Sequence, residues 1–286
     1  MCNKLFKKVA VVTGSNKGIG FAIVKGLLQN NYPGIVYLTS RDESNGQHAI
    51  ELLHNLGLNA CYHQLDINDI DSVNQLARDI EIKHGGIDLL INNAAIKYSS
   101  KSTESHKNIV INTLETNYYG TKRVCNVLFP LLNKHAQIIN VSSAAGHVSV
   151  IPDPDLRNKF TKNITIEELE HILTDYINLE ENYTTYQWKN MGYVLSKVAI
   201  CAFTVAQQKL FNEESAQRCI RINSVHPGYV NTDMTQGRGI QSPEDGAKSA
   251  LFLALNDEHD YRGDFIWYNC KRVDWLSDTM PNDIKP

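Results

Sequence analysis

The chain has 286 residues, of which 42% are hydrophobic and 21% charged, and its formal net charge at pH 7 is −3. This length can bury a sizeable core, as one large α/β domain or as two ordinary ones. The charges include no basic run or acidic tail, so nothing indicates a nucleic acid or a membrane surface as partner. A small molecule is therefore the expected partner.

Cysteine usage indicates a reducing compartment. The six cysteines include no Cys-x-x-Cys pair, and no charged-then-apolar leader precedes the first predicted strand. No apolar run approaches the roughly 20 residues that a membrane span needs. No Cys/His cluster has metal-ligand spacing, so no metal is expected. We expect a soluble, cytoplasmic protein with reduced thiols.

Short apolar, β-branched runs recur along the chain and predict strands. They lie at residues 9–12, 35–38, 87–91, 137–141, 220–225 and 264–268, with 61–67 as a further, more polar strand. Stretches of helical periodicity separate most of them, which is typical of βαβ units. Because there is no repeat and no Gly/Ser linker, we predict one α/β domain over 1–286. Its fold is a Rossmann-type doubly wound parallel sheet of about seven strands with helices on both faces.

The first predicted strand leads into TGSNKGIG at residues 13–20. Gly14, Gly18 and Gly20 lie on a strand-to-helix turn, where glycine lets the backbone approach a phosphate closely and adopt positive φ. The free N–H groups at the start of the following helix favour an anion. This pattern predicts a pyrophosphate cradle, and an ordinary glycine-rich turn is the alternative.

Two cations indicate which dinucleotide binds. Lys17 lies in the glycine turn, and Arg41 follows the second predicted strand, where NAD enzymes often have an acid for the ribose hydroxyls. The planar fork of arginine suits the 2′-phosphate of NADP. Asp42 comes next and weakens the inference slightly. A solvated strand-end charge is the alternative reading of Arg41.

The strand–helix alternation breaks in a helical insertion at about 152–190. It opens with IPDPD at residues 151–155, which is a loop signal because proline restricts its neighbours. Thr165 to Glu168 has the form of a capping box, and apolar residues recur at helical spacing up to Ile177. An amphipathic helix is therefore predicted within the insertion.

Tyr193 and Lys197 are four residues apart on a predicted helix, hence on one face. An ammonium ~5 Å from a phenol, at an effective dielectric of ~20, favours the phenolate by ~3 kcal/mol, or about two pKa units. A tyrosine tuned in this way can exchange a proton near neutral pH. Tyr118 and Lys122 have the same spacing, so the pattern alone does not choose between the pairs.

The surroundings of the two pairs favour Tyr193. An apolar helical run follows Lys197, and a predicted strand upstream ends in NVSSAAG. A hydroxyl at that strand end, Ser143, would lie at the carboxyl edge of the sheet, where open α/β folds bind ligands. Serine there can donate to a substrate carbonyl oxygen, although a Ser-Ser pair on its own is more typical of a strand-ending turn.

Six motifs together, in order and at sensible separations, resemble the short-chain dehydrogenase/reductase family from about residue 6 to residue 275. They are TGSNKGIG, NNAA at 92–95, Asn117 in TNYYGT, NVSS, YVLSK and HPGYVNTDM at 226–234. The insertion before the tyrosine, with NKGIG, SPEDGA and KRVDW, more specifically resembles the NADPH-dependent carbonyl reductases of the carbonyl reductase 1 type.

The resemblance implies that Asn117, Ser143, Tyr193 and Lys197 carry the chemistry. Tyr193 would protonate the substrate carbonyl oxygen, and Ser143 would hold and polarise that oxygen. Lys197 would bind the ribose and lower the tyrosine's pKa, and Asn117 would hold a proton-relaying water. Hydride would come from the nicotinamide.

The resemblance also implies the residues that bind NADPH or NADP. They are Gly14, Ser15, Asn16, Lys17, Gly18, Ile19, Gly20, Arg41, Asp66, Ile67, Asn93, Ala94, Val141 (by its backbone), Tyr193, Lys197, Pro227, Gly228, Val230, Asn231 and Thr232.

Two departures from the family pattern occur among these motifs. Ala95 replaces the last glycine of the usual NNAG, so its backbone must avoid positive φ or bear the strain, and we expect little functional effect. His226 stands where some carbonyl reductases have cysteine, which puts glutathione-linked substrates in doubt. A structural role is expected for this histidine.

The expected substrate-binding residues are Ser143, Tyr193, Tyr229 and Met234, with Trp188 as a further apolar wall or merely an anchor of the insertion. The expected activity is NADPH-dependent reduction of ketones, aldehydes or quinones to alcohols. Oxidation of a specific alcohol, such as a steroid or prostaglandin, is one alternative. A catalytically silent NADP-binding redox sensor is another.

The predicted helix of the insertion affects the expected oligomeric state. By resemblance, the helix at 165–177 lies over the surface through which most members of the family form dimers or tetramers. A monomer is therefore predicted. A substrate lid is the competing interpretation, and both can hold.

Overall fold

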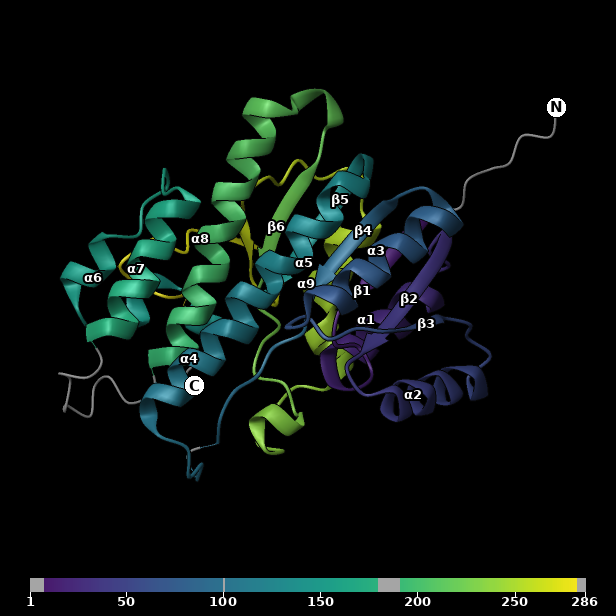
Figure 1. Cartoon of the computed structure of the whole chain (residues 1–286), viewed down its shortest axis with the longest axis horizontal. Helices are drawn as coiled ribbons and strands as arrows, with labels where there is room; N and C mark the ends of the chain where they lie inside the picture. Colours follow the sequence, from purple (N-terminus) through teal and green to yellow (C-terminus); the bar gives the residue numbers. More distant parts are fainter. Residues whose placement is uncertain (1–7, 100, 180–190, 282–286) are drawn as a thin grey trace.

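The computed structural model describes residues 8–99, 101–179 and 191–281. Within them, one sheet has the strand order β3-β2-β1-β4-β5-β6-β7-β8 (Figure 1). The strands are β1 (Lys8–Val12), β2 (Gly34–Ser40), β3 (Cys61–Gln64), β4 (Ile87–Asn92), β5 (Leu132–Val141), β6 (Arg221–Val225), β7 (Phe265–Ile266) and β8 (Arg272–Val273). Neighbouring strands from β3 to β7 pair in parallel, and β8 pairs antiparallel to β7.

The predicted doubly wound parallel sheet is confirmed, with differences at its margins. β5 starts at Leu132, earlier than predicted, because the exposed polar residues that follow Leu132 conceal the strand pattern. β3 is shorter than predicted and ends at Gln64. The eighth strand was missed because two residues, Arg272 and Val273, are too few to show a periodicity.

Helices cover both faces of the sheet (Figure 1). They are α1 (Gly18–Gln29), α2 (Glu43–Asn55), α3 (Ile70–His84), α4 (His106–Leu114), α5 (Thr121–Leu128), α6 (Pro154–Asn158), α7 (Ile166–Leu179), α8 (Met191–Glu214) and α9 (Pro243–Leu255). Alternate residues of β1 explain the two layers: Ala10 and Val12 pack with α1, α2 and α9, whereas Val9 and Val11 pack with α3 and α5.

The insertion contributes α6 and α7, which lie beside α8, at the end of the molecule away from β3 and α2 (Figure 1). The predicted capping box is confirmed: the Glu168 N–H donates to Thr165 Oγ1 at 3.1 Å, and the Thr165 N–H donates to Glu168 Oε2 at 2.9 Å. Leu169 and Leu173 are fully buried in the core that also contains α8 residues. Trp188 lies outside the described residues.

The second Tyr-x-x-x-Lys pair holds this inserted helix in place. Tyr118 is completely buried, and its hydroxyl donates to Glu170 Oε1 of α7 at 3.3 Å. Lys122 forms an ion pair with the same carboxylate. This pair therefore has a structural role.

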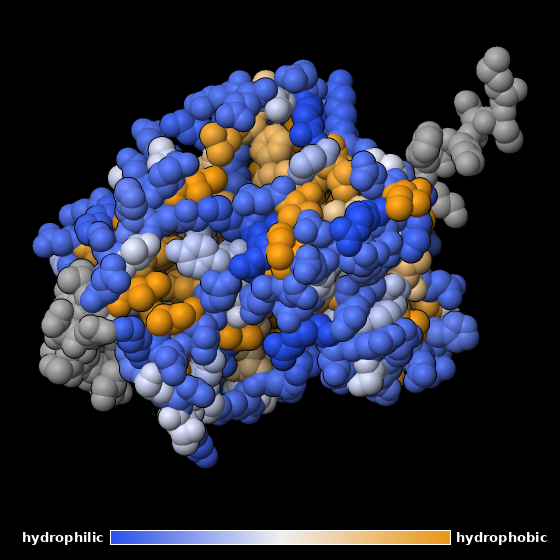
Figure 2. Space-filling view, viewed as in Figure 1, coloured by the Kyte–Doolittle hydropathy of each residue, from blue (hydrophilic) through white to orange (hydrophobic). Residues whose placement is uncertain are grey.

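Helix α8 corrects the expectation that no apolar run approaches the length of a membrane span. Among the described residues, it is the one helix whose length and hydropathy would allow it to cross a membrane. However, 72% of its most apolar window is buried inside the protein, as expected of a core helix. Figure 2 shows that hydrophilic residues cover most of the face in view and that hydrophobic ones reach the surface in separate groups.

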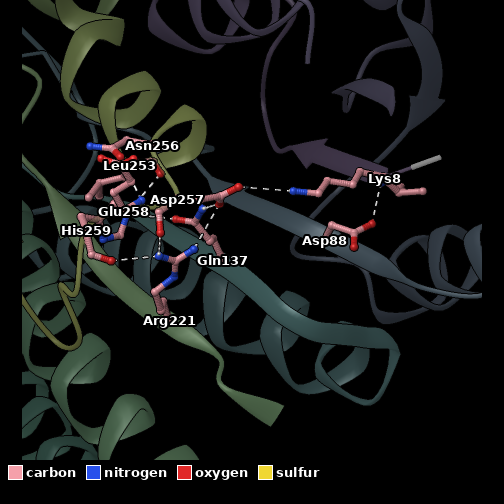
Figure 3. A network of polar contacts seen from close by, with 10 residues as sticks. Lys8, Asp88, Gln137, Arg221, Leu253, Asn256, Asp257, Glu258 and His259 are labelled. Carbon is pink, nitrogen blue, oxygen red and sulfur yellow. Dashed lines mark hydrogen bonds and ion pairs between the residues drawn. The ribbon is translucent and has the colours of Figure 1, made fainter. Parts of the chain in front are cut away.

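A polar network closes the amino-terminal edge of the sheet (Figure 3). Arg221, the first residue of β6, donates to the carbonyl oxygens of Asp257 at 3.1 Å and His259 at 2.9 Å. Its guanidinium also pairs with the Asp257 carboxylate at 3.3 Å. Lys8, the first residue of β1, reaches the same carboxylate at 3.7 Å. The network ties the segment after α9 to the strand starts.

Candidate active site

A pocket of about 460 Å³ lies along the carboxyl ends of the parallel strands. This is the edge at which open α/β sheets bind ligands. The predicted residues that line it are Gly14, Asn16, Lys17, Gly18, Ile19, Gly20, Arg41, Asp66, Ile67, Asn93, Ala94, Asn231, Thr232 and Met234. The fold therefore brings most of the predicted cofactor residues to one cavity.

The glycine turn has the geometry of a phosphate cradle. Gly14 and Gly18 have φ of +58° and +56°, and a Cβ on Gly20 would lie 2.7 Å from the Gly14 carbonyl oxygen. α1 starts at Gly18 without a side-chain cap, so the first N–H groups of the helix are left for an anion. These features fit a pyrophosphate group.

Thr13 and Asn93 hold the turn in place. The Thr13 hydroxyl accepts from the N–H groups of Asn93 and Ala94, each at 3.0 Å. The Asn93 amide donates to the carbonyl oxygens of Thr13 and Gly14, at 3.0 and 2.9 Å. β1 and β4 therefore end in one rigid unit beneath the pocket.

Arg41 lines the pocket, and its acidic neighbour is engaged elsewhere. Asp42 caps α2 by accepting from the Asn45 N–H at 2.8 Å and from the Ser44 hydroxyl at 2.7 Å. These hydrogen bonds lower the pKa of the Asp42 carboxyl. Lys17 pairs with Asp233 at 2.6 Å, with both side chains exposed. The arginine thus faces the pocket as a cation that the adjacent acid does not hold.

Several predicted cofactor residues do not line the pocket. Ser15 is fully buried, and its hydroxyl joins the glycine turn to β2 by donating to Val12 O and accepting from the Thr39 N–H. Val230 is buried. The preceding residue, Tyr229, is held through its carbonyl oxygen, which accepts from the backbone N–H groups of Ile240 and Gln241. The other residues outside the lining are Val141, Tyr193, Lys197, Pro227 and Gly228. Gly228, with φ of +91°, forms the turn after β6.

The two serines at the end of β5 have different environments. Ser142 is buried, donates to the Lys197 carbonyl oxygen at 2.8 Å and accepts from the Cys201 thiol at 3.3 Å. Ser143 is half-buried, and its hydroxyl accepts from the Ala145 N–H at 3.2 Å. Ser143 is thus the more exposed of the two serines, while Ser142 anchors α8.

Tyr193 and Lys197 lie together on α8, with the Lys197 ammonium 5.8 Å from the tyrosine ring centroid. The tyrosine hydroxyl contacts Met234 Sδ at 3.9 Å. The Lys197 ammonium donates to the Val141 carbonyl oxygen at 2.9 Å, and burial lowers its pKa to about 8. Met234 is thus placed beside the predicted acid.

We predicted that Lys197 lowers the pKa of Tyr193, and this direction was wrong. Burial raises the pKa of the phenol, and the hydrogen bond with Ser143 lowers it by less. The prediction placed both groups in a medium of intermediate dielectric and left out the desolvation of the phenol. Desolvation also lowers the pKa of Lys197, so its ammonium loses a proton more easily and is a weaker source of positive charge.

Asn117 lies in a π-helical segment, η1 (Glu115–Gly120), between α4 and α5. Its amide oxygen accepts from the Ile96 N–H at 2.8 Å, and its amide nitrogen donates to Ile96 O and Ser196 Oγ, each at 3.0 Å. Because the side chain is fully engaged, it fixes the chain after β4 to α8. Local π-helical turns of this kind are frequent at functional sites.

The two departures from the family pattern fit the fold. Ala95 does not have a positive φ, as expected. His226 is buried against Trp267, with ring centroids 4.3 Å apart, and burial lowers the pKa of its imidazole to about 3. A neutral buried ring agrees with the predicted structural role.

Some residues of the site were missed from the sequence. They include Thr13, together with Leu65, Asn68, Ala95, Ile96, Thr116, Asp233 and Pro243 in the pocket lining. Asn68, in the turn between β3 and α3, and Thr116, in η1, are joined by a hydrogen bond of 3.0 Å. Their position directly after predicted strands, or beside Asn117, was the available signal.

Comparisons with known proteins agree with this geometry. The sequence pattern of the short chain dehydrogenase family matches residues 8–153. The chain is 36% identical over 276 residues to carbonyl reductase (NADPH) 1 of Sus scrofa, covering 94% of both chains.

Two plant enzymes are similar in structure. Salutaridine reductase from Papaver somniferum has a TM-score of 0.76 and 28% identity, with 92% of this chain and 100% of that chain covered. Menthone neomenthol reductase from Mentha piperita has a TM-score of 0.75 and 29% identity, with 92% and 99% covered.

Proposed function

Because the chain belongs to the short chain dehydrogenase family, we propose that it reduces ketones, aldehydes or quinones with NADPH, with Tyr193 as general acid. One observation carries this proposal. Tyr193 and Lys197 lie together on α8, Ser143 at the end of β5 hydrogen-bonds Tyr193, and Met234 connects the Tyr193 hydroxyl to the glycine-lined pocket. The relative from Sus scrofa is a carbonyl reductase with NADPH in its name.

The residues of the pocket fit NADPH. The uncapped N-terminus of α1 and the close-packed glycines would hold the pyrophosphate. Arg41 would hold the 2′-phosphate, with Lys17 as a second cation once it exchanges Asp233 for the phosphate. When bound, the nicotinamide supplies the hydride.

The chain's own residues would supply the proton and the orientation. The raised pKa keeps the Tyr193 phenol protonated at neutral pH, which suits an acid that donates to the carbonyl oxygen. The Ser143 hydroxyl would donate to the same oxygen and strengthen its hydrogen bond as negative charge develops. Lys197 would bind the ribose. The positive charge of its ammonium would also favour loss of the Tyr193 proton during the reaction.

Asn117 would serve the proton path through its backbone. Its side-chain amide is engaged by Ile96 and Ser196, and its backbone carbonyl oxygen accepts from the Thr121 hydroxyl at 2.9 Å. A water on that oxygen could pass a proton toward Lys197. The predicted water would therefore be bound by the main chain.

The test is the rate of NADPH loss with quinones, aromatic aldehydes and isatin-like diketones, beside NADH and beside Tyr193→Phe. We expect turnover that prefers NADPH and falls at least 100-fold in the variant, which should still bind NADPH. Turnover only of NADP with an alcohol would favour the oxidative alternative. Binding of NADPH without turnover across the panel would favour the redox sensor.

We also infer a cytoplasmic monomer. α7 packs its apolar residues, including Leu169 and Leu173, on the core that contains α8, so this face of α8 is covered within the chain. The five described cysteines are free thiols, which is consistent with a reducing compartment. Gel filtration tests the assembly, and elution as a stable dimer would refute the monomer.

A further inference from the structure

Lys97 lies beside the proposed acid but belongs to no role assigned above. It follows β4, and its ammonium lies 4.9 Å from the centroid of the Tyr193 ring. The Lys197 ammonium lies 5.8 Å from the same centroid. Two cations therefore approach the phenol, one from its own helix and one from the loop after β4.

The position of Lys97 is fixed from both sides. The preceding residue, Ile96, exchanges two backbone hydrogen bonds with the Asn117 amide, at 2.8 and 3.0 Å. The following residue, Tyr98, accepts from the Asn112 amide at 3.1 Å. The loop therefore presents the lysine at a defined place, even though its side chain is exposed.

A second cavity, of about 540 Å³, opens at this loop. Its lining includes Lys97, Lys101 and Arg41, and it shares Ile96 and Arg41 with the glycine-lined pocket. The segment 233–238 reaches the same loop, because the Gln236 amide donates to Ser99 Oγ at 2.9 Å. This segment carries Arg238, whose charge, after burial, helps to lower the Lys97 pKa.

Positive charge at this place is not balanced by nearby acids. Asp233 is already paired with Lys17. In residues 8–99, 101–179 and 191–281, no carboxylate forms an ion pair with Lys97 or Arg238. Arg41 and Lys17 are assigned above to the cofactor phosphates, whereas Lys97 lies beside the Tyr193 ring.

We propose that Lys97, supported by Arg238, is a specificity-determining residue that favours carbonyl substrates bearing a carboxylate near the reacting group. This inference rests on the proposed function and narrows its substrate class. A carboxylate would relieve the repulsion between the two cations and accept hydrogen bonds from the ammonium. A neutral carbonyl compound of the same shape would leave both cations unpaired.

The experiment compares 4-carboxybenzaldehyde with its uncharged methyl ester, using the full-length wild type, Lys97→Met, Lys97→Arg and Lys134→Met. Lys134 is an exposed lysine at the start of β5, on the opposite edge of the sheet, and serves as the matched control. For each protein, kcat/KM is measured for both compounds with NADPH. The two compounds are also titrated by calorimetry into the NADP-loaded proteins, where no reduction occurs.

We expect wild type to prefer the carboxylate, and Lys97→Met to lose about five- to tenfold of that preference. Lys97→Arg and Lys134→Met should keep the preference, and added salt should reduce it. The inference is overturned if wild type shows no preference, if Lys97→Met keeps it, or if the variant raises only the KM for NADPH.

The calorimetric measurement separates this inference from the proposed function. A carboxylate preference in binding that disappears in Lys97→Met supports the charged subsite even if neither aldehyde is reduced. In that case only the proposed reductase activity fails. Equal binding of both compounds to wild type and variant counts against the subsite alone.

Discussion

The Lys197 ammonium donates a hydrogen bond to the Val141 carbonyl oxygen, at 2.9 Å, where α8 packs on the end of β5. Lys197 is only 3% exposed. Burial lowers the pKa of its ammonium from 10.5 to about 8. The buried ammonium therefore has an unfavourable desolvation free energy, which this hydrogen bond offsets only in part.

This burial predicts that Lys197→Met stabilises the fold. Between pH 8 and 10.5 the unfolded chain binds more protons at this lysine, so the lysine's contribution to stability rises with pH. Below pH 8 its burial costs up to about 3 kcal/mol. Allowing for the lost hydrogen bond, we expect the free energy of unfolding at pH 7 to rise by about 2 kcal/mol.

Urea unfolding at pH 7 and pH 10 measures this effect, with Lys134→Met as control. The gain should shrink at pH 10, where the native lysine is neutral. A less stable Lys197→Met at pH 7 would show instead that the ammonium is a net stabiliser.

Ser142 and Ser143 should separate stability from catalysis. Ser142→Ala removes the hydroxyl that holds the Lys197 carbonyl oxygen and the Cys201 thiol, and we expect a loss of about 1–3 kcal/mol. Ser143→Ala should leave stability nearly unchanged but lower kcat about 100-fold. Thermal unfolding and steady-state kinetics on both variants test this. A loss of stability in Ser143→Ala and a loss of kcat in Ser142→Ala would reverse the two assignments.

Arg41 should decide between the two dinucleotides. Arg41→Ala is expected to raise the KM for NADPH at least tenfold with little change for NADH, because a charged, forked contact to one phosphate is lost. The measurement is the ratio of kcat/KM for the two cofactors. The control is Arg78→Ala, on the exposed surface of α3, which should leave the ratio unchanged. An equal loss with NADH would remove Arg41 from phosphate recognition.

Arg221 should matter for folding and not for the reaction. Arg221→Met leaves the Asp257 and His259 carbonyl oxygens without their donor at the edge opposite the pocket, which we expect to cost about 2–4 kcal/mol. Lys8→Met, which removes only an exposed ion pair with Asp257, should cost less than about 1 kcal/mol. Chemical unfolding checks both, and kcat per folded molecule should be unchanged in each.

Features that depend on neighbouring residues could be predicted from the sequence. β1 and the glycine turn follow from a β-branched run and from glycines at set spacing, and α7 follows from Thr165, Glu168 and a helical apolar stripe. β8 could not be predicted, because two residues carry no periodicity. The choice of Ser143 over Ser142 came from resemblance, since two adjacent serines differ only in what surrounds them.

Properties that depend on burial and on distant contacts were decided only by the tertiary structure. The Tyr193 pKa is raised because packing removes water from the phenol, a term that the Tyr-x-x-x-Lys spacing does not contain. Asn117 clamps Ile96, 21 residues away in the chain, and so brings Lys97 over the Tyr193 ring. Local pattern thus specifies the elements and the chemistry available in them, whereas long-range packing sets which groups meet and how strongly each holds its proton.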